Sequence, residues 1–437
     1  MPELAPNTVA FEPGSVVDPV GRVFHLDGRV FRAIAPGYDG FVAQTLDRAV
    51  RLGWFDAGLI PTWRTSYTLP GFPLVIEHQR IPVVTLRGEW TAEGVRDAAL
   101  CILHLSARLC RSNLCLKDAH PWNVLFDGTT PYFIDWGSLA PAEDLNWPFW
   151  YRQFRQYLLA PLHAFSTGLP RIARAMLREQ KIGVGNEIIE LPELAQLPGV
   201  PHEIAQLAGT APTVGTFEAL AAYVSSLTFP NVDGEWSSYG QPVWAPLDFG
   251  ALRGKDRVVH RILAGDPGRS LLDLGTNRGL HSEMAASLGK RVVACDIEEG
   301  CLNDLYLRTR ASRVDVLPLY HDFLWPIGTS GILNSIPAAE DRLACDTLLM
   351  MAVVHHLAFK LHVSFEAMAR GIARLARHRA VVEFVPPDDE HVARWSPERL
   401  PWYGLDRFVA AMRRHFDIQA MVSSEPAPRC VIVFDKQ

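Results

Sequence analysis

One stretch of the chain limits its possible folds more than any other. Residues 271–280 read LLDLGTNRGL, an apolar run that breaks into a turn with two glycines. A second apolar run, RVVACD, follows and ends in Asp296. In α/β sheets such a turn lets the backbone approach a nucleoside, and the second acid accepts hydrogen bonds from ribose hydroxyls. The spacing therefore predicts a nucleoside site at the edge of a parallel sheet.

The rest of the C-terminal part alternates between strand and helix patterns. Helices are expected at 254–264, 279–289, 299–309, 361–377 and 405–415. Strands are expected at 269–274, 291–296, 314–319, 345–353, 379–385, 417–423 and 429–434. Strands separated by helices predict an α/β fold with a mostly parallel sheet of seven strands, covered on both faces and closed by a hairpin.

Polar residues stand at the expected ends of these strands. The glycine turn follows the pattern DxGxNxG, which differs from the dinucleotide pattern GxGxxG. Asp322 follows a third apolar run, a histidine pair follows the fourth, and an acid lies near the end of the fifth. The candidate residues of this edge are Asp273, Gly275, Asn277, Gly279, Asp296, Asp322, His355, His356 and Glu383.

This pattern resembles the class I S-adenosylmethionine-dependent methyltransferases, and the resemblance covers the whole C-terminal half. It extends to bacterial proteins of that class that include nodulation-type proteins, whose methyl acceptors are poorly defined. The resemblance implies a Rossmann-like domain that binds S-adenosylmethionine through the DxGxNxG turn and Asp296. It also implies an adenine contact from Asp322 and a methyl group beside the residues that follow the fourth strand.

The candidates for catalysis are His355, His356 and Glu383. The sulfonium methyl is already electrophilic, so the enzyme mainly has to position a nucleophile in line with the C–S bond. A neutral histidine can also take a proton from the acceptor, and Glu383 is a second candidate base. The alternative readings are a helix cap or a packed imidazole for the histidines, and an ordinary strand-end acid for Glu383.

The N-terminal half carries a second motif cluster. A hairpin is expected at 16–34, two more strands at 74–87, a helix at 91–111 and an aromatic-rich helical stretch at 147–180. Between them, LKDAHPWNVLF and FIDWGS place Asp118, Asn123 and Asp135 in the spacing DxxxxN followed by DxG. This resembles the catalytic and metal loops of protein-kinase-like enzymes, where the first Asp orients a hydroxyl and the other two residues hold Mg²⁺ with ATP.

The same region departs from the kinase pattern. No lysine occurs before Lys117, so only arginines such as Arg29 or Arg32 could replace the lysine that holds the phosphates. No GxGxxG loop precedes the first hairpin. We therefore expect a degenerate α+β kinase-like domain that binds or presents a polar substrate. The alternative reading is that Asp118, Asn123 and Asp135 are turn residues bonded to their own backbone.

The leading hypothesis is a methyltransferase with two domains, 1–245 (kinase-like or substrate-presenting) and 246–437 (methyltransferase). Its acceptor is open: a small molecule, a sugar, or a carrier-bound or peptide group, methylated at O, N or C. One alternative is a bifunctional enzyme whose N-terminal domain transfers phosphate from Mg-ATP. Another is a non-catalytic protein that binds adenosylmethionine or serves as a scaffold.

Composition narrows the remaining classes. The net charge of −6 argues against nucleic acid as a general partner. No apolar run approaches the ~18 residues that span a bilayer, and the N-terminus lacks the pattern of a signal peptide. Seven scattered cysteines without a CxxC pair suggest neither a disulfide framework nor a zinc site. A bacterial protein in a reducing, cytoplasmic setting is expected; its oligomeric state stays open.

Overall fold

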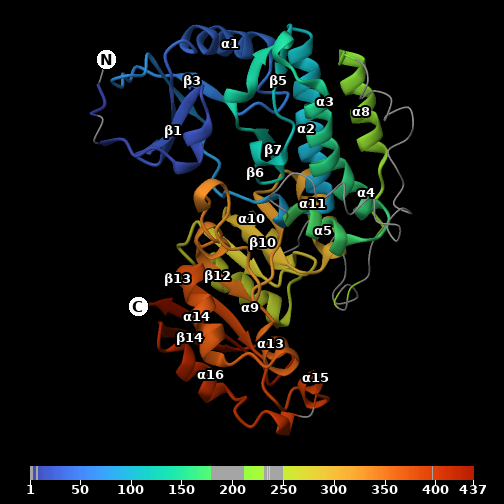
Figure 1. Ribbon diagram of the computed structural model, residues 1–437. Coiled ribbons are helices and arrows are strands. Elements are labelled where there is room, and N and C mark those ends of the chain that lie inside the picture. Colours follow the sequence, from blue (N-terminus) through green and yellow to red (C-terminus); the bar gives the residue numbers. More distant parts are fainter. Residues whose placement is uncertain are drawn as a thin grey trace. The chain divides into compact units, whose positions relative to one another are not determined.

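The computed structural model describes residues 3–5, 8–178, 211–230, 234, 236, 250–395 and 397–437. The chain forms two compact units (Figure 1). Unit 1 comprises Met1–Asn231 with Thr329–Pro337, and unit 2 comprises Val232–Gly328 with Ala338–Gln437. The domain boundary expected at 245/246 lies outside the described residues.

Unit 2 is built on one seven-stranded sheet. Its strands are β9 (Ser270–Leu274), β10 (Arg291–Asp296), β11 (Val316–Tyr320), β12 (Cys345–Met350), β13 (Ala376–Phe384), β14 (Phe416–Ser423) and β15 (Cys430–Lys436). Their order is β11-β10-β9-β12-β13-β15-β14. The first five strands are parallel, and β15 runs antiparallel to both of its neighbours. The expected α/β sheet and its closing hairpin are thereby confirmed.

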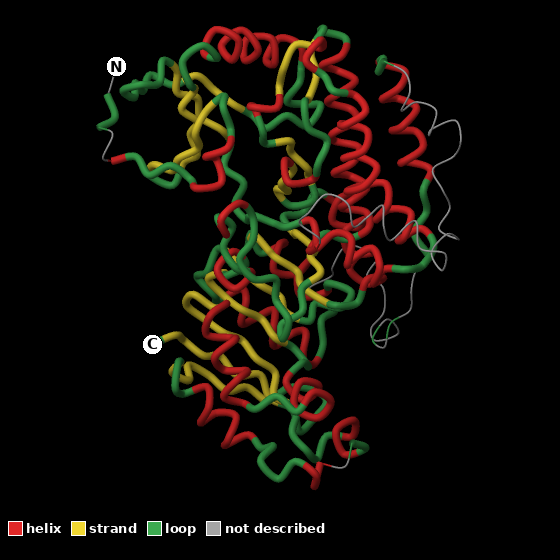
Figure 2. The backbone as a smooth tube through the Cα atoms, in the orientation of Figure 1, coloured by secondary structure: helices red, strands yellow, loops and turns green. Residues whose placement is uncertain are grey.

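Helices cover both faces of this sheet (Figure 2). On one face, Val259 and Met284 of two helices pack in one core cluster with Leu349 and Val381 of the strands. Phe384 points to the opposite face, because side chains alternate along a strand, and it stacks on Phe408. The helices of this unit are α9 (Gly254–Ala264), α10 (Leu280–Ser287), α11 (Glu299–Ser312), α12 (Ala339–Arg342), α13 (Val354–Leu361), α14 (Phe365–Leu375), α15 (Glu390–Ala393) and α16 (Leu405–Met412).

The region after β12 differs from the sequence expectation. The strand expected at 345–353 ends at Met350, and the helix expected at 361–377 forms as α14 over Phe365–Leu375. A further helix, α13, was not expected; it precedes α14 and ends where His362 adopts a left-handed conformation (φ 54°). Ser364 then caps α14 by accepting a hydrogen bond from the backbone of Ala367. The two candidate histidines therefore lie on the first turn of a helix.

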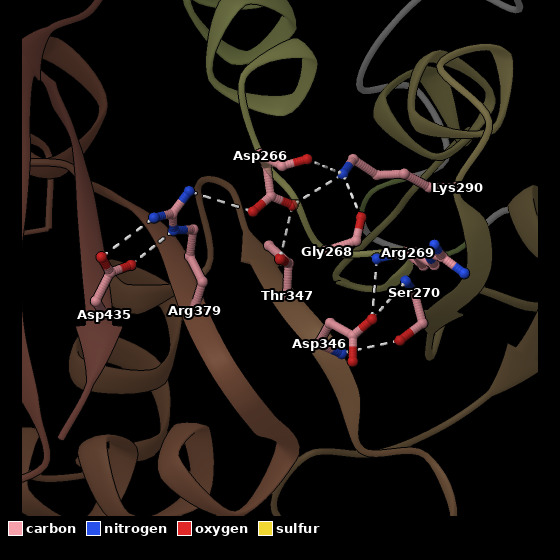
Figure 3. Close-up of polar contacts among 9 residues, drawn as sticks. All are labelled: Asp266, Gly268, Arg269, Ser270, Lys290, Asp346, Thr347, Arg379 and Asp435. Carbon is pink, nitrogen blue, oxygen red and sulfur yellow. Dashed lines mark hydrogen bonds and ion pairs between the residues drawn. The ribbon is translucent and has the colours of Figure 1, made fainter.

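A buried ionic network holds the amino ends of the parallel strands together (Figure 3). Lys290 donates to the carboxylate of Asp266 at 2.9 Å and to two backbone carbonyls. Asp266 also accepts from Thr347 at 2.8 Å and from Arg379 at 3.2 Å, and Arg379 pairs in turn with Asp435. Every charge in this network has an opposite partner, and its members come from five strands or the segments leading into them.

Unit 1 begins with an antiparallel sheet in the order β1-β2-β4-β3. Its strands are β1 (Gly21–Leu26), β2 (Arg29–Ile34), β3 (Thr62–Arg64) and β4 (Leu74–His78). The expected hairpin is confirmed, and both turn residues, Asp27 and Gly28, have positive φ. Helix α1 (Asp39–Leu52) was not expected. The prediction of a second strand within 74–87 is wrong. Pro82 has no N–H to donate to a neighbouring strand, and a 3₁₀ turn begins at Arg87.

The remainder of unit 1 is mostly helical. Helix α2 (Ala92–Cys110) confirms the helix expected at 91–111, and Thr91 caps it. Two antiparallel strand pairs follow, β5 (Leu114–Leu116) with β8 (Leu139–Pro141) and the hairpin of β6 (Val124–Asp127) with β7 (Thr130–Phe133). The helices after them are α3 (Trp147–Phe154), a π-helical turn (Arg155–Leu159), α4 (Ala160–Ser166), α5 (Pro170–Arg178) and α8 (Val214–Ser226). Among the described residues of both units, no helix combines the length and the apolar character needed to cross a bilayer.

Unit 1 also takes in a short segment from the C-terminal half of the sequence. Residues Thr329–Pro337, which lie between β11 and β12 in the chain, cluster with unit 1. A bridge between Ser330 and Ile336 closes this segment into a loop. Ser335 of the loop packs so closely on Gly14 that a Cβ at Gly14 would lie 2.9 Å from the serine hydroxyl. The chain therefore passes between the two units three times.

Candidate functional site

The sheet of unit 2 has a topological switch point between β9 and β12. From β9 the chain continues through β10 and β11 on one side, and it later returns through β12 and β13 on the other. Open α/β sheets bind ligands outside the carboxyl ends of their strands at such a point. The glycine turn follows β9 and the histidine pair follows β12, so both candidate motifs lie at this edge.

The two glycines of the turn are required by the backbone and by close packing. Gly275 has φ +81° and Gly279 has φ +83°, which side chains with a Cβ rarely adopt. A Cβ at Gly275 would lie 2.5 Å from Val353, and one at Gly279 would lie 2.3 Å from Leu305. The first glycine thus brings the loop after β9 directly against the loop after β12.

Asp273 supports the turn from beneath. It is 1% exposed and accepts hydrogen bonds from Thr276 at 2.9 Å and from Ser282 at 2.6 Å. Burial raises the pKa of the Asp273 carboxyl, and the two hydroxyl donors counteract the increase. These bonds fix the shape of the turn from within.

Asp296 ties the end of β10 to the glycine turn. One carboxylate oxygen accepts from the backbone N–H of Asn277 at 2.6 Å, and the other accepts from Ile297 and Glu298 at 2.7 and 3.0 Å. Burial raises the pKa of Asp296, while these three donors favour its charged form. Asn277 itself has φ 48°, and its side-chain amide donates to the carbonyl of Trp236 at 2.9 Å. Asp296 and Asn277 are thus brought together, as the spacing predicts.

Asp322 lies at the end of the neighbouring edge strand. It follows β11 and accepts from the backbone N–H groups of Leu324 and Trp325 at 2.9 and 3.2 Å. These bonds form a local turn directly after β11. Because β11 pairs with β10, Asp322 is nearer to Asp296 in the sheet order than to Asp273.

The two histidines form an aromatic cluster on the first turn of α13. The ring centroids of His355 and His356 lie 4.0 Å apart, and Trp395 lies 5.5 and 5.1 Å from them. The ring of Trp236 lies 4.2 Å from His356. Burial, together with the neighbouring His356 and Arg429, lowers the pKa of His355 to about 2. His355 is therefore a neutral imidazole at physiological pH.

Glu383 lies near the end of β13 and is 0% exposed. Among the described residues, neither of its carboxylate oxygens accepts a hydrogen bond. The ammonium of Lys255, on the first turn of α9, lies 3.6 Å from one of them. A buried carboxylate without a hydrogen-bond donor is rare in native proteins, and such groups often have a functional reason.

Several residues of this edge were not found from the sequence. They are Trp236, Lys255, Thr276, Ser282 and Trp395. Thr276 and Ser282 could have been suspected, because they lie in or beside the glycine turn and carry hydroxyls. The other three are far from the motifs in sequence, and no spacing rule connects them to the turn.

The motif residues of unit 1 also converge. Asp135 follows β7, and the guanidinium of Arg32 on β2 lies 3.2 Å from its carboxylate. Arg32 also pairs with Asp18, which packs against the backbone of Gly137. Burial raises the pKa of Asp18. One buried arginine is thus shared by two carboxylates.

Asp118 and Asn123 lie on the loop between β5 and β6. Gln153 donates to the carboxylate of Asp118 at 3.3 Å, and the backbone N–H of Asp118 donates to the hydroxyl of Ser138 at 3.1 Å. The carbonyl of Asn123 accepts from Ile134, which places Asn123 beside the residue before Asp135. Within the described ranges, no group of three or more His, Cys, Asp or Glu side chains is arranged to hold a metal ion.

The strand order and the glycine turn at the switch point define unit 2 as a Rossmann-like α/β unit with a nucleoside-type edge. No protein-family model matches the chain. The chain is 26% identical over 434 residues to the nodulation protein NoeA of Rhizobium meliloti strain 1021. The match covers 91% of this chain and 90% of that protein.

Similar solved structures include two methyltransferases. Magnesium protoporphyrin IX methyltransferase (ChlM) of Synechocystis PCC 6803 with bound SAM is 17% identical, over 42% of this chain and 79% of that one, with a TM-score of 0.29. The N-methyltransferase NodS of Bradyrhizobium japonicum WM9 is 13% identical, over 41% and 96%, with a TM-score of 0.31. These TM-scores are too low to define the fold, which rests on the sheet order described above.

Proposed function

We propose that unit 2 is an S-adenosylmethionine-dependent methyltransferase. The observation that carries the proposal is the glycine turn at the switch point, joined on one side to Asp296 and on the other to the loop after β12. A nucleoside held by Asp296 and the turn would extend toward β12, where His355 and His356 begin α13. The order of the strands and the closing antiparallel hairpin support the same class.

The residues present fit this cofactor. Gly275 and Gly279 keep the turn free of side chains, so its backbone can approach a ligand closely. Asp296 would accept from the ribose hydroxyls, and Asp322 would lie toward the adenine. Asp273 would act through the turn, since its carboxylate is buried under it. When bound, S-adenosylmethionine supplies an electrophilic methyl group.

The chain's own residues then position the acceptor and handle its proton. Trp236 and Trp395 pack on the histidines and exclude water from the first turn of α13. His355 is neutral but a weak base, because its pKa is far below 7. We therefore assign His355 to positioning and leave proton acceptance to His356 or Glu383.

We also propose that unit 1 is a degenerate kinase-like domain that helps to bind the acceptor. Its antiparallel sheet, long helix α2 and hairpin β6–β7 appear in the order expected from the motif resemblance. Arg32 reaches Asp135 from the first sheet, as the missing lysine would. Asp118, Asn123 and Asp135 would line a polar site for part of the acceptor.

No observation favours phosphate transfer by unit 1. The carboxylate of Asp135, which would have to hold Mg²⁺, faces Arg32, and a second carboxylate from Asp18 shares that arginine. The charge that would attract phosphates is thus already neutralised. A non-catalytic binding protein remains distinct from our proposal, because it predicts cofactor binding without methyl transfer to any acceptor pool.

Calorimetric titration with S-adenosylhomocysteine tests the cofactor site. We expect the wild-type protein to bind it and Gly275→Ala to weaken binding at least tenfold, because the new Cβ meets Val353 in a strained backbone. Gly404→Ala is the matched control: its φ is −166° and its surroundings are open, so affinity should not change. Absence of binding to the wild type would refute the proposal.

A further inference from the structure

The buried carboxylate of Glu383 lacks any hydrogen-bond donor among the described residues. Within the described ranges, the ammonium of Lys255 pairs with it at 3.6 Å, beyond hydrogen-bond distance. The side chain of Lys255 is 24% exposed, whereas that of Glu383 is fully buried. A buried carboxylate without a hydrogen-bond donor is unfavourable even beside a cation, so a donor from outside the protein would stabilise Glu383.

The sheet register places Glu383 level with the glycine turn. Leu349 of β12 lies opposite Asp273, and Met350 lies opposite Val382. Continuing both ladders by one or two residues puts Gly275, Met351 and Glu383 in one row across three strands. Neighbouring strands are about 4.8 Å apart, so the backbones of Gly275 and Glu383 are separated by roughly 10 Å.

The position of Glu383 indicates that it would contact the acceptor and not the cofactor. Asp296 and Asp322 lie on the β10 and β11 side of the turn, whereas Glu383 lies on the opposite side, beyond β12. A ligand that starts at Asp296 and passes over the turn reaches β12 before it reaches Glu383. The donor that Glu383 lacks therefore belongs to the molecule beyond the methyl group.

We infer that the methyl acceptor is an amine, bound through its ammonium group by Glu383. This inference rests on the proposed methyltransferase function. An ammonium group carries a positive charge and several N–H donors, so it satisfies both free oxygens of the carboxylate. A hydroxyl offers one donor and no charge, and it would leave one buried oxygen unpaired. The ammonium of Lys255 is the competitor, and it moves toward solvent when the acceptor binds.

Glu383 also prepares the amine for reaction. It takes one proton from the ammonium, which leaves a neutral amine with a free lone pair. That lone pair forms the new N–C bond to the methyl carbon while the C–S bond breaks, and both electrons of that bond pass to the sulfur. The methylated nitrogen then carries the positive charge, and Glu383 returns its proton to water after the product leaves.

Binding of two matched probes to the protein loaded with S-adenosylhomocysteine tests this inference. Benzylamine and benzyl alcohol share one ring and differ only in the group that Glu383 would meet. We expect benzylamine to bind at least tenfold more tightly than benzyl alcohol in a calorimetric or NMR titration of the full chain. Equal binding of the two probes, or no binding of either, overturns the inference.

Three variants identify the group responsible. Glu383→Gln should remove the preference for benzylamine while changing the affinity for S-adenosylhomocysteine by less than twofold. Lys255→Met, which keeps the carboxylate and removes its competitor, should tighten benzylamine binding at least threefold. Asp417→Asn, an exposed acid on the edge strand β14, is the control and should alter neither.

The outcomes separate this inference from the proposed function. If the wild type does not bind S-adenosylhomocysteine, the methyltransferase proposal itself fails. If Glu383→Gln folds but loses S-adenosylhomocysteine at least tenfold, the carboxylate serves the cofactor, and the amine inference is wrong. If Lys255→Met lowers stability without tightening benzylamine, Lys255 and Glu383 form a structural ion pair only.

Discussion

At the scale of single residues, the edge of unit 2 combines a carefully supported turn with poorly satisfied groups. Asp273 and Asp296 each accept two or more hydrogen bonds from the turn or its flanks. Glu383 accepts none, and the Nδ1 of His355 has no partner among the described residues. Stable support beneath the turn and unsatisfied groups beside it are what a site prepared for ligands requires.

Ser282 provides a test of the support beneath the turn. Its hydroxyl donates to the buried carboxylate of Asp273 at 2.6 Å. We expect Ser282→Ala to lower the free energy of unfolding by about 2 kcal/mol, as for other hydrogen bonds to buried charged groups. Binding of S-adenosylhomocysteine should weaken at least threefold, because the turn loses one of its two supports.

Ser287 supplies the matched control on the same helix. Its hydroxyl donates only to the backbone carbonyl of Met284, at the end of α10. Ser287→Ala should change stability by less than about 0.5 kcal/mol and leave cofactor affinity unchanged. Urea unfolding and calorimetric titration of both variants measure the difference; equal effects would contradict the role given to Ser282.

At the scale of elements, the carboxyl and amino ends of the parallel strands in unit 2 have different roles. The carboxyl ends carry the glycine turn, the histidine helix and Glu383. The amino ends carry the network of Asp266, Lys290 and Arg379, in which the charges are paired and Asp266 and Lys290 are buried. Because ligands bind at the carboxyl ends, the network contributes to stability and not to the site.

Removal of Asp266 tests this division. Asp266→Ala leaves the ammonium of Lys290 buried without its carboxylate, and breaking a buried pair costs about 3 kcal/mol or more. S-adenosylhomocysteine affinity, measured where the variant is still folded, should stay within twofold of the wild type. Asp315→Asn is the control, because its pair with Arg291 is half exposed on both sides and contributes less than about 1 kcal/mol.

Local patterns predicted all seven strands of unit 2, and the glycine turn with Asp296 marked the switch point. They did not predict helix α13, which directly follows β12. This helix is short because His362 adopts a left-handed backbone conformation and ends it, and a histidine gives little warning of that conformation. Helix α1, between β2 and β3, was not predicted from the sequence.

The part of the candidate site that we propose for the cofactor was predictable from the sequence, and the part that we propose for the acceptor was much less so. Asp273, Gly275 and Asp296 follow from one continuous pattern, because a βαβ unit brings its own ends together. The contacts of Trp236 and Trp395 with His356 join segments distant in sequence. The pairing of Lys255 with Glu383 depends in the same way on the packing of α9 against β13, which no spacing in a single chain reveals.

At the scale of the whole molecule, both units bury neutral histidines. Burial lowers the pKa of His163 in unit 1 to about 4 and that of His355 in unit 2 to about 2. The ordinary value, near 6.5, applies in the unfolded chain. Below pH 6.5 the unfolded chain therefore binds protons that the folded protein does not, and stability falls as the pH falls.

We expect each of these histidines to lower the free energy of unfolding by about 1.4 kcal/mol between pH 7.5 and pH 5.5. His355→Gln should reduce the acid sensitivity of unit 2 alone, and His163→Gln that of unit 1 alone. Urea unfolding at both pH values, with hydrogen exchange to locate the unit that opens, measures this. Stability that rises on acidification would show that the imidazoles gain protons on folding.

The segment Thr329–Pro337 should prevent the two units from being separated by a single cut between them. A protease that cuts after Asn231 would leave this segment on the C-terminal fragment although it packs in the N-terminal unit, with Ser335 against Gly14. The two fragments should therefore co-purify after a single cut. Expression of either half alone would leave unit 1 without one of its pieces, so a split version of this protein should be assembled by co-expression.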